Sequence, residues 1–567
     1  MAVEIPMKKA KAIIPIIFFA LLLLAGSVLH DDYGGFTDEI IEINTAAVNA
    51  KYILKKFPAL FPDGEHIIPA IGTLEQVPDL LTYEDRVYGT AVMMPTILAA
   101  LIPGVHFDTA SFLNFRRFYT FLQFFLALIG FYLLLQVRFR STWTAMAGTL
   151  MLTLTPRFFA ESFYNCKDIV FFSWFLISLS GIGIYLIRKT GWGLALFALG
   201  FALAANTRMV GFVLLPAFLF ACAFVFWKDC DERRRQFPRI IVTALAALVL
   251  FYAVTPYLWE SPVKNFIEGI HFSSAELSER EIELLSETGI SALGQAELFM
   301  DKLVSPKEIW YYLPVWMGIT IPVLYLILFF IEIGWIAASA VRSSRHAGSA
   351  NFPAVFFDTF CFLLLTGGMG GMILMKVNLY HGWRHAYFLY APLIYLAACG
   401  FGNLLALPCK KAGMFRVKNG ILTGILLISF TGTGLWMVRN HPLDFVYFNE
   451  IGRHSGRQFA RDYWGVASKR CLLDLLNEYD GKRIRIGLNE DLTWGSTEFS
   501  LMRLPPEQQQ KFDPIWQTEN AEYLCFSYKN TPGNGHLIPD FEILKTYQVD
   551  GFDVGAIYRR TQNFKYQ

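Results

Sequence analysis

The sequence predicts an all-α polytopic membrane protein that ends in a small α/β domain. Of the 567 residues, 54% are hydrophobic and 16% are aromatic, which exceeds the apolar content of soluble domains. Several apolar runs approach the roughly 20 residues that a helix needs to cross a bilayer. After Arg439 the composition becomes that of a soluble protein. We therefore predict a transmembrane domain over residues 1–438 and an extracytoplasmic α/β domain over residues 439–567.

Charge and cysteine usage narrow the classes of function. The formal net charge is only +2, so nothing in the balance of charge indicates a nucleic-acid partner. The 8 cysteines lie far apart, without CxxC pairs or metal-ligand spacing, and indicate neither a zinc site nor a disulfide framework. The position of each charge relative to the apolar runs is therefore more informative than the sum.

The first apolar run, Ala12–Leu29, follows Lys8, Lys9 and Lys11, which the positive-inside rule keeps in the cytoplasm. Its length favours an uncleaved anchor over a signal peptide. Including it, about eleven spans of an inner or plasma membrane are predicted. The others are Phe118–Val137, Trp143–Phe159, Ile169–Ile187, Gly193–Ala205, Val210–Trp227, Ile240–Pro256, Leu313–Ile333, Phe356–Met375, Tyr387–Leu405 and Ile421–Val438.

The run Ala91–Ile102 is ambiguous because it is short and contains Pro95. If it lies in the interface, nearly every Lys/Arg cluster between spans falls in the cytoplasm. Counting it as a span would invert that pattern. We therefore expect an interfacial segment here, with the C-terminal domain on the external side.

The polar segment from His30 to about Tyr88 is expected to be an external loop with short helices on the membrane surface. Asp38 and Glu39 lie near its start, directly after the first span. Carboxylates are costly to hold near hydrocarbon and usually serve a function there. The pair is thus a candidate reaction centre, although a solvated acidic loop would have the same local sequence.

Two further external links carry charges. Asn165, Lys167 and Asp168 lie in the first, where Asp168 opens the next helix and complements its dipole. Such charges can also serve simply to end helices. Arg208 stands alone between two closely spaced spans, a position suited to holding a phosphate.

The link Lys376–His385 contains His381, Arg384 and His385 among aromatic residues typical of a membrane interface. Arg384 and His385 are expected to form a positive pocket together with Lys167 and Arg208. This pocket would face Asp38 and Glu39. Such a pocket would suit an anionic, lipid-linked substrate.

The tail shows strand and helix patterns. Strands are predicted over 483–488 and 523–528, with a hairpin of 541–549 and 554–559 turning at Asp550-Gly551, and a helix over 471–479. The stretches 441–450 and 461–465 are interpreted as seating this domain on the membrane.

Taken together, these motifs resemble the C-type glycosyltransferase superfamily, in its protein O-mannosyltransferase and aminoarabinose transferase branch. The resemblance covers roughly Ile13 to Ala406. Its motifs here are Asp38-Glu39, Asp85-Arg86-Val87-Tyr88-Gly89, Arg117, Pro156 through Asp168, and Arg384 with Pro392. Tyr88-Gly89 departs from the His-Pro-Pro element usual in that branch, and the tail differs from that of either enzyme.

The resemblance implies transfer of a sugar from a polyprenyl-phosphate carrier to a lipid, glycan or protein acceptor in the cell envelope. Asp38 matches the catalytic aspartate of the first loop and would act as general base in an inverting displacement, with Glu39 and Asp168 assisting. Arg208 and Arg384 would stabilise the phosphate leaving group. The remaining substrate-binding candidates are Arg86, Tyr88, Arg117, Asn165, Lys167, His381 and His385. No cofactor is predicted, and a divalent metal bridging Asp38 and Asp168 remains an open alternative.

Two other classes of function compete with this one. A lipid or solute transporter or flippase would hold charges near the bilayer midplane in two corresponding halves, whereas here the charges gather at external ends. A structural assembly protein would leave the cationic cluster without a purpose. The sequence indicates neither the sugar, the acceptor nor the oligomeric state.

Overall fold

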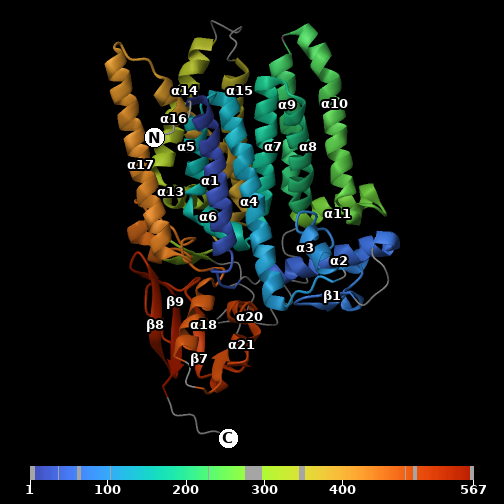
Figure 1. Cartoon of the computed structure of the whole chain (residues 1–567), viewed down its shortest axis with the longest axis vertical. Coiled ribbons are helices and arrows are strands. Elements are labelled where there is room, and N and C mark those ends of the chain that lie inside the picture. Colours follow the sequence, from blue (N-terminus) through green and yellow to red (C-terminus); the bar gives the residue numbers. More distant parts are fainter. Residues whose placement is uncertain are drawn as a thin grey trace, which may run out of the picture.

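The structure, a computed structural model, describes residues 7–35, 38–60, 66–102, 104–227, 229–274, 297–343, 352–478, 481–488 and 495–561. Long helices run side by side in one bundle, and a sheet-containing domain lies beyond one end (Figure 1). The bundle helices are α1 (Met7–Leu29), α4 (Thr109–Phe139), α5 (Thr142–Thr153), α6 (Pro156–Tyr164), α7 (Asp168–Arg188), α8 (Gly191–Thr207), α9 (Leu214–Phe226), α10 (Cys230–Ala253), α13 (Tyr312–Thr320), α14 (Val323–Ser343), α15 (Phe352–Leu374), α16 (Tyr390–Ala406) and α17 (Ala412–Asn440).

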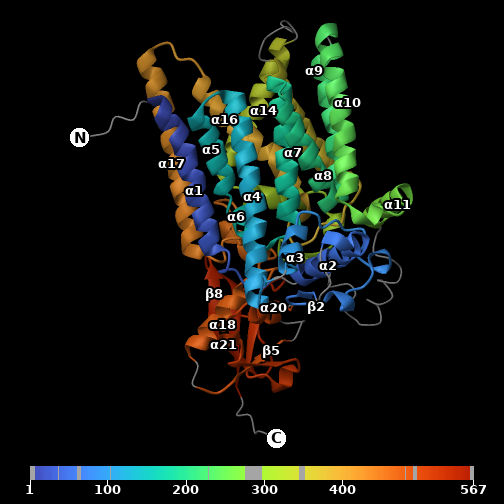
Figure 2. The ribbon, with the colours of Figure 1, turned by 45° about the vertical axis from the view of Figure 1, so that its right-hand side comes forward.

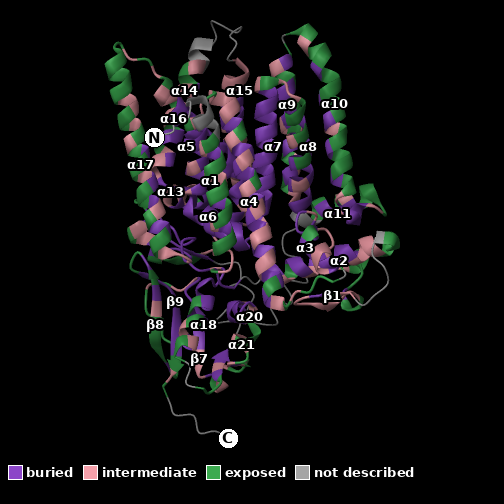
Figure 3. Cartoon of the chain, viewed as in Figure 1, coloured by how far each residue is buried: buried purple, intermediate pink, exposed green. Residues whose placement is uncertain are grey.

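The outer helices expose apolar side chains, as a lipid environment requires. On α10 and α17 these include Val242 (65% exposed), Val249 (64%) and Ile428 (75%), whereas α7 is almost wholly buried at the centre (Figure 3). Seven of the described helices are long and apolar enough to cross a membrane, or eight if α13 and α14 form one broken span. The protein is an integral membrane protein with a mostly helical fold, as the sequence predicts.

The order of the predicted spans is kept, but several are broken or short. The run Leu313–Ile333 is not one straight span. It is divided into α13 and α14, whose axes are bent by 117° at a short break that contains Pro322. Trp143–Phe159 is divided between α5 and α6, and Pro156 opens α6. Proline has no N–H to donate and keeps the residue before it out of helical geometry, so both breaks fall where a proline stands. The apolar part of α1, Ile13–Leu29, and the helix α8, Gly191–Thr207, are shorter than the roughly 20 residues that usually cross a bilayer, and a count of eleven spans is not confirmed.

The first loop, predicted to be external, folds into a small unit of its own at one end of the bundle (Figures 1 and 2). It contains α2 (Asp38–Lys56), α3 (Met94–Ala100) and a short pairing of β1 (Ile67–Ile68) with β2 (Gly72–Thr73). Ile43, Ala47 and Ile97 are fully buried in its core. Because α3 has only 7 residues and packs on α2, the run around it does not cross the membrane.

At the same end lie the described parts of the later loops that are predicted to be external. These are α11 (Pro262–Ser274), the hairpin of β3 (Glu297–Phe299) with β4 (Lys302–Val304), and the 3₁₀ helix η7 (Arg384–Leu389) that leads into α16. The part of the predicted loop from 275 to 296 lies outside the described residues. The first loop, these pieces and the C-terminal domain thus share one end of the bundle.

The C-terminal domain is a five-stranded sheet with helices against it. The strands β5 (Ile484–Gly487), β6 (Phe512–Ile515), β7 (Tyr523–Ser527), β8 (Phe541–Val549) and β9 (Phe552–Arg560) lie in the order β6-β5-β7-β9-β8. β5 pairs in parallel with β6 and β7, and β9 is antiparallel to β7 and β8. The helices are α18 (Ala467–Asn477), α20 (Ser496–Met502) and α21 (Pro506–Gln509). The predicted hairpin turning at Asp550-Gly551 is confirmed.

The domain is fastened to the start of the first loop. Lys469 donates to Asp31 at 2.6 Å, and Arg503 lies 3.4 Å from the same carboxylate. These cations outweigh the effect of burial and hold the pKa of Asp31 below its ordinary value. At Gly34 an added Cβ would lie 2.1 Å from the Val466 carbonyl oxygen, so only glycine permits this close approach of the two backbones.

Candidate functional site

Asp168 is the centre of a buried group of charges at the end of the bundle that carries the first loop and the C-terminal domain. It is 1% exposed and opens α7, where the helix dipole favours a carboxylate. Its backbone N–H donates to Asn165 Oδ1 at 2.8 Å, which fixes the turn before the helix. One carboxylate oxygen accepts from Arg208 Nη2, and the other lies 3.4 Å from Arg384 Nη1. Asp168 therefore joins two cations that are far apart in the sequence.

Arg384 connects Asp168 to the first loop. Its Nη1 also lies 3.3 Å from Asp38 Oδ2, on the first turn of α2. The guanidinium carbon is 5.1 Å from the ring centre of Tyr380, 5.0 Å from that of Tyr463 and 4.8 Å from that of Trp464. Aromatic faces stabilise a desolvated guanidinium without neutralising it. Arg384 thus stays available to anions although it is 5% exposed.

A second pair lies beside this group. Lys167 Nζ is 2.7 Å from Glu42 Oε1, one turn after Asp38 on α2, and 3.6 Å from the ring centre of Tyr88. Burial lowers the pKa of Lys167, but the Glu42 carboxylate outweighs it, so the pKa is raised and the side chain is a cation. Tyr88 therefore lies against the cationic cluster.

Three predicted site residues hold the first loop in place instead of joining the cluster. Glu39 lies 3.4 Å from Arg117 Nη2, and Arg117 also donates to the carbonyl oxygens of Tyr33 and Gly34. Arg86 pairs with Glu268 on α11. Successive residues on a helix point about 100° apart, so Asp38 and Glu39 cannot face the same site. Glu39 therefore pairs with Arg117, and its assistance to Asp38 stays a prediction.

The two histidines line the site through their rings. His381 stacks on Tyr463 with ring centres 3.1 Å apart, and His385 lies 4.4 Å from the ring centre of Tyr380. Burial lowers the pKa of His381 well below its ordinary value, with Arg384 acting in the same direction. His381 is thus neutral near pH 7.

Sequence reasoning missed several residues of the cluster. Glu42 has a signal in the sequence, since it stands four positions after Asp38 and so lies on the same face of α2. Tyr463 and Trp464 fall in the stretch interpreted as a membrane seat, whereas the structure places both against Arg384. Lys529, after β7, also lies here and is 3% exposed. Nothing in its neighbourhood in the sequence marks it.

The carboxylates do not fit a bridging metal as they stand. Arg384 Nη1 lies between Asp38 and Asp168, at 3.3 and 3.4 Å, in the place that such an ion would need. Within the described part of the chain, no group of three or more His, Cys, Asp and Glu side chains is arranged to hold a metal. The arrangement is that of an ion-pair network suited to binding and releasing an anion.

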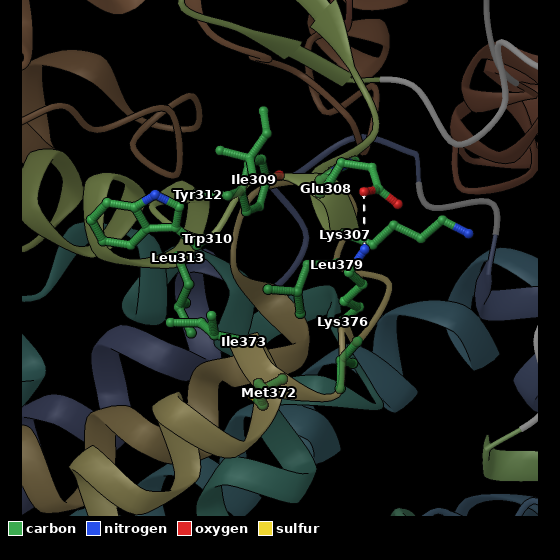
Figure 4. Close-up of a pocket in the computed structure, with 12 residues that line it drawn as sticks. Lys307, Glu308, Ile309, Trp310, Tyr312, Leu313, Met372, Ile373, Lys376 and Leu379 are labelled. Carbon is green, nitrogen blue, oxygen red and sulfur yellow. Dashed lines mark hydrogen bonds and ion pairs between the residues drawn. The ribbon is translucent and has the colours of Figure 1, made fainter.

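Two surface pockets lie away from the cluster. One, of about 100 Å³, lies between the segment Pro306–Leu313 and the outer end of α15, where Lys376 pairs with Glu308 (Figure 4). Its inner wall includes Tyr312, which donates to Glu297 at 2.6 Å. The other, of about 590 Å³, is lined by Lys189, Arg239 and apolar residues of α8 and α10. Neither is lined by Asp38 or Asp168.

No protein-family model matches the chain, and no curated protein sequence matches it. Among solved structures, the chain is similar to the crystal structure of ArnT from Cupriavidus metallidurans bound to undecaprenyl phosphate. The sequences are 11% identical, the TM-score is 0.40, and the match covers 96% of this chain and 97% of the other. The likeness is therefore distant, although it extends over nearly the full length of both chains.

Proposed function

We propose that this protein is a glycosyltransferase that moves a sugar from a polyprenyl-phosphate carrier to an acceptor on the external side of the membrane. The observation that carries the proposal is the alternating row Arg208, Asp168, Arg384, Asp38 at the loop-bearing end of the bundle. It places cations for a phosphate and a carboxylate for a hydroxyl within one group of contacts. Membership of the C-type superfamily is part of this proposal and rests on the sequence motifs.

Asp38 is the carboxylate best placed to act as general base. Its side chain is 33% exposed, whereas those of Asp168, Glu42 and Glu39 are 1%, 9% and 7% exposed. An acceptor hydroxyl can therefore approach Asp38 but not the others. As that oxygen attacks the anomeric carbon from the face opposite the phosphate, its proton passes to Asp38, and the anomeric configuration is inverted.

Arg208 and Arg384 stabilise the departing phosphate. Breaking the bond between the anomeric carbon and the phosphate oxygen leaves negative charge on that oxygen, and fixed cations in a site with little water stabilise it strongly. Each guanidinium has a buried Nε without a hydrogen-bond partner among the described residues. These N–H groups are donors that a phosphate can use. Asp168 orients both side chains.

Asp38→Asn tests the proposal. We expect the variant to insert into membranes but to lose transfer from a radiolabelled polyprenyl-phosphate sugar, because an amide cannot accept the proton. Asp32→Asn is a matched control, since Asp32 is a carboxylate of the same loop that contacts His441 and not the cluster. Turnover at the wild-type rate by Asp38→Asn would refute the assignment. Mass spectrometry of envelope glycans from cells lacking the protein would identify the sugar and the acceptor.

A transporter or flippase is the competing class of function, and it would use buried charges elsewhere in the bundle. Arg138 forms a buried ion pair with Asp358 at 2.6 Å, and the fully buried Glu332 lies in the neighbouring α14. Buried charges among spanning helices often mark a transport path. If Asp358→Asn abolished lipid movement across vesicles while Asp38→Asn left it unchanged, the transporter would be preferred.

A further inference from the structure

Lys529 brings the C-terminal domain into the candidate site. It follows β7, the middle strand of the sheet, and its carbonyl oxygen accepts from Arg461 N at 3.0 Å. That contact holds it against the segment that carries Tyr463. Its Nζ lies 4.6 Å from the ring centre of Tyr463, the same ring that lies 5.0 Å from the guanidinium of Arg384. One aromatic ring thus carries a cation from the bundle and a cation from the C-terminal domain.

Groups from four other parts of the chain face Lys529. Three are charged, namely Asp38 on α2, Glu297 on β3 and Arg384 on η7. The fourth is the neutral ring of His381, between α15 and η7. Glu297 is itself engaged, since it accepts from Tyr312 at 2.6 Å and from the backbone of Gly382 at 2.7 Å. Two buried cations beside one ring repel each other, and a bound anion would relieve that repulsion.

We propose that Lys529 binds the phosphate group of the lipid carrier together with Arg384, so that the C-terminal domain completes the substrate site. This inference rests on the proposed function and adds a residue to the same site. Arg384 divides its charge between Asp38 and Asp168 before any ligand arrives. Arg208 pairs with Asp168 and Lys167 with Glu42, so these cations and carboxylates balance, and Lys529 is the cation that gives the site a net attraction for a phosphate dianion. In this arrangement the C-terminal domain is a wall of the active site and not a separate module.

The proposal predicts that binding of the phosphate is coupled to the uptake of a proton. Burial lowers the pKa of Lys529 to about 7, with Arg384 acting in the same direction and Glu297 and Asp38 against it. A phosphate bound beside it would raise that pKa, so binding takes up a proton above pH 7. Affinity is then highest between about pH 6 and pH 7, and it falls as the pH rises from about 7 towards the higher pKa of the complex. The ligand does not contribute above pH 7, because its second pKa is about 6.

Binding of undecaprenyl phosphate to the full chain in nanodiscs tests this coupling. Calorimetry at pH 7.0 and 8.5, in buffers of different ionisation enthalpy, measures both affinity and proton uptake. For the wild type we expect affinity to fall about tenfold between these pH values, with uptake of close to one proton at pH 8.5. Asp462 also titrates near pH 7, so the assignment to Lys529 needs variants.

Lys529→Met is expected to weaken binding about tenfold at pH 7.0 and to abolish proton uptake. Lys529→Arg is expected to keep the affinity at pH 8.5 without proton uptake, because arginine stays charged. Lys545→Met is the matched control, since Lys545 is a 51%-exposed lysine of the same domain paired with Asp474. If Lys529→Met does not fold, proton uptake by the wild type and its loss in Lys529→Arg decide the matter.

The outcomes separate the two proposals. Wild-type affinity in Lys529→Met, or a wild type that takes up no proton, would overturn the role of Lys529 and leave the proposed function standing. A wild type that binds undecaprenyl phosphate no better than undecaprenol would overturn the proposed function itself. Inorganic phosphate is the third probe: weak, millimolar competition supports a lipid headgroup as the ligand, whereas affinity equal to that of undecaprenyl phosphate would overturn the lipid assignment.

Discussion

Asp168→Asn should both destabilise the protein and make it more dependent on its ligand. Asp168 is the counter-charge of two guanidiniums, and the Arg384 side chain is only 6% exposed. Removing one partner of a buried ion pair costs about 3–5 kcal/mol, because the other charge stays buried without compensation. Arg208 is 22% exposed and can be solvated in part. We therefore expect a loss near the lower end, about 3 kcal/mol.

Undecaprenyl phosphate should restore most of this loss. In the wild type, Asp168 competes with the phosphate for both guanidiniums, whereas in the variant the phosphate is the only anion that can lie between them. A ligand at 100 times its dissociation constant stabilises the folded state by about 2.7 kcal/mol, which is comparable with the loss. The ligand-induced shift of the unfolding temperature should thus be larger in the variant than in the wild type.

Thermal unfolding of purified protein, with and without the ligand, measures both effects. Glu308→Gln is the control, because it removes a carboxylate from an exposed pair with Lys376, in which the two side chains are 58% and 65% exposed, and should change little. An unfolding temperature of Asp168→Asn within a degree of the wild type would refute the reasoning about buried charge. A ligand shift no larger than that of the wild type would refute the competition between Asp168 and phosphate.

Three further predictions follow from the same structure. Arg208→Ala should weaken binding of undecaprenyl phosphate more than Arg208→Lys does, because lysine keeps the charge although it loses the planar pair of donors of the guanidinium. Equal effects of the two substitutions in a binding titration would argue against a two-point contact with the phosphate. Asp462→Asn should flatten the dependence of thermal stability on pH. Burial raises the pKa of Asp462 to about 7, so its contribution to stability is fullest below about pH 4 and is lost as the pH rises through 7. An unchanged slope of stability against pH between about pH 5 and 8 would contradict this. Gly465→Ala should lower the unfolding temperature and weaken ligand binding, because the added Cβ would lie 2.1 Å from the Ser496 Cβ. Gly551→Ala is the control: Gly551 also has a positive φ, but an added Cβ there would have nothing within 4 Å, so the substitution should cost only about 1 kcal/mol of backbone strain.

The charges at the external ends of the spans could be found from sequence because the membrane restricts where they can lie. An ionised side chain next to an apolar run must sit at a bilayer edge, and the alternation of spans decides which edge. That reasoning selects Asp168, Arg208 and Arg384, and the structure has all three in contact. It also expects the C-terminal domain at the same end, which is where the structure has it.

The choice between neighbouring carboxylates required the phase of a helix. Helical spacing in the first loop is evident in the sequence only from about Asn44 onward, whereas α2 begins at Asp38. Extending that helix by two turns would have favoured Glu42, four residues on, over Glu39, one residue on. The difference therefore comes from the boundary of the element and not from the type of residue.

Lys529 illustrates what no local pattern can supply. It lies 491 positions after Asp38 by their numbers, and it reaches the site because β7 is the middle strand of the sheet and points its end at Tyr463. That geometry depends on pairing β7 with both β5 and β9, and β6 beyond β5 was not expected at all. A buried lysine after a strand looks, in sequence, like any lysine at the end of a strand. A function can be argued for it only when the order of the strands brings it beside Arg384. Proton uptake on binding is therefore the observation that best separates a site residue from a structural one, because it requires a buried lysine whose pKa is near 7.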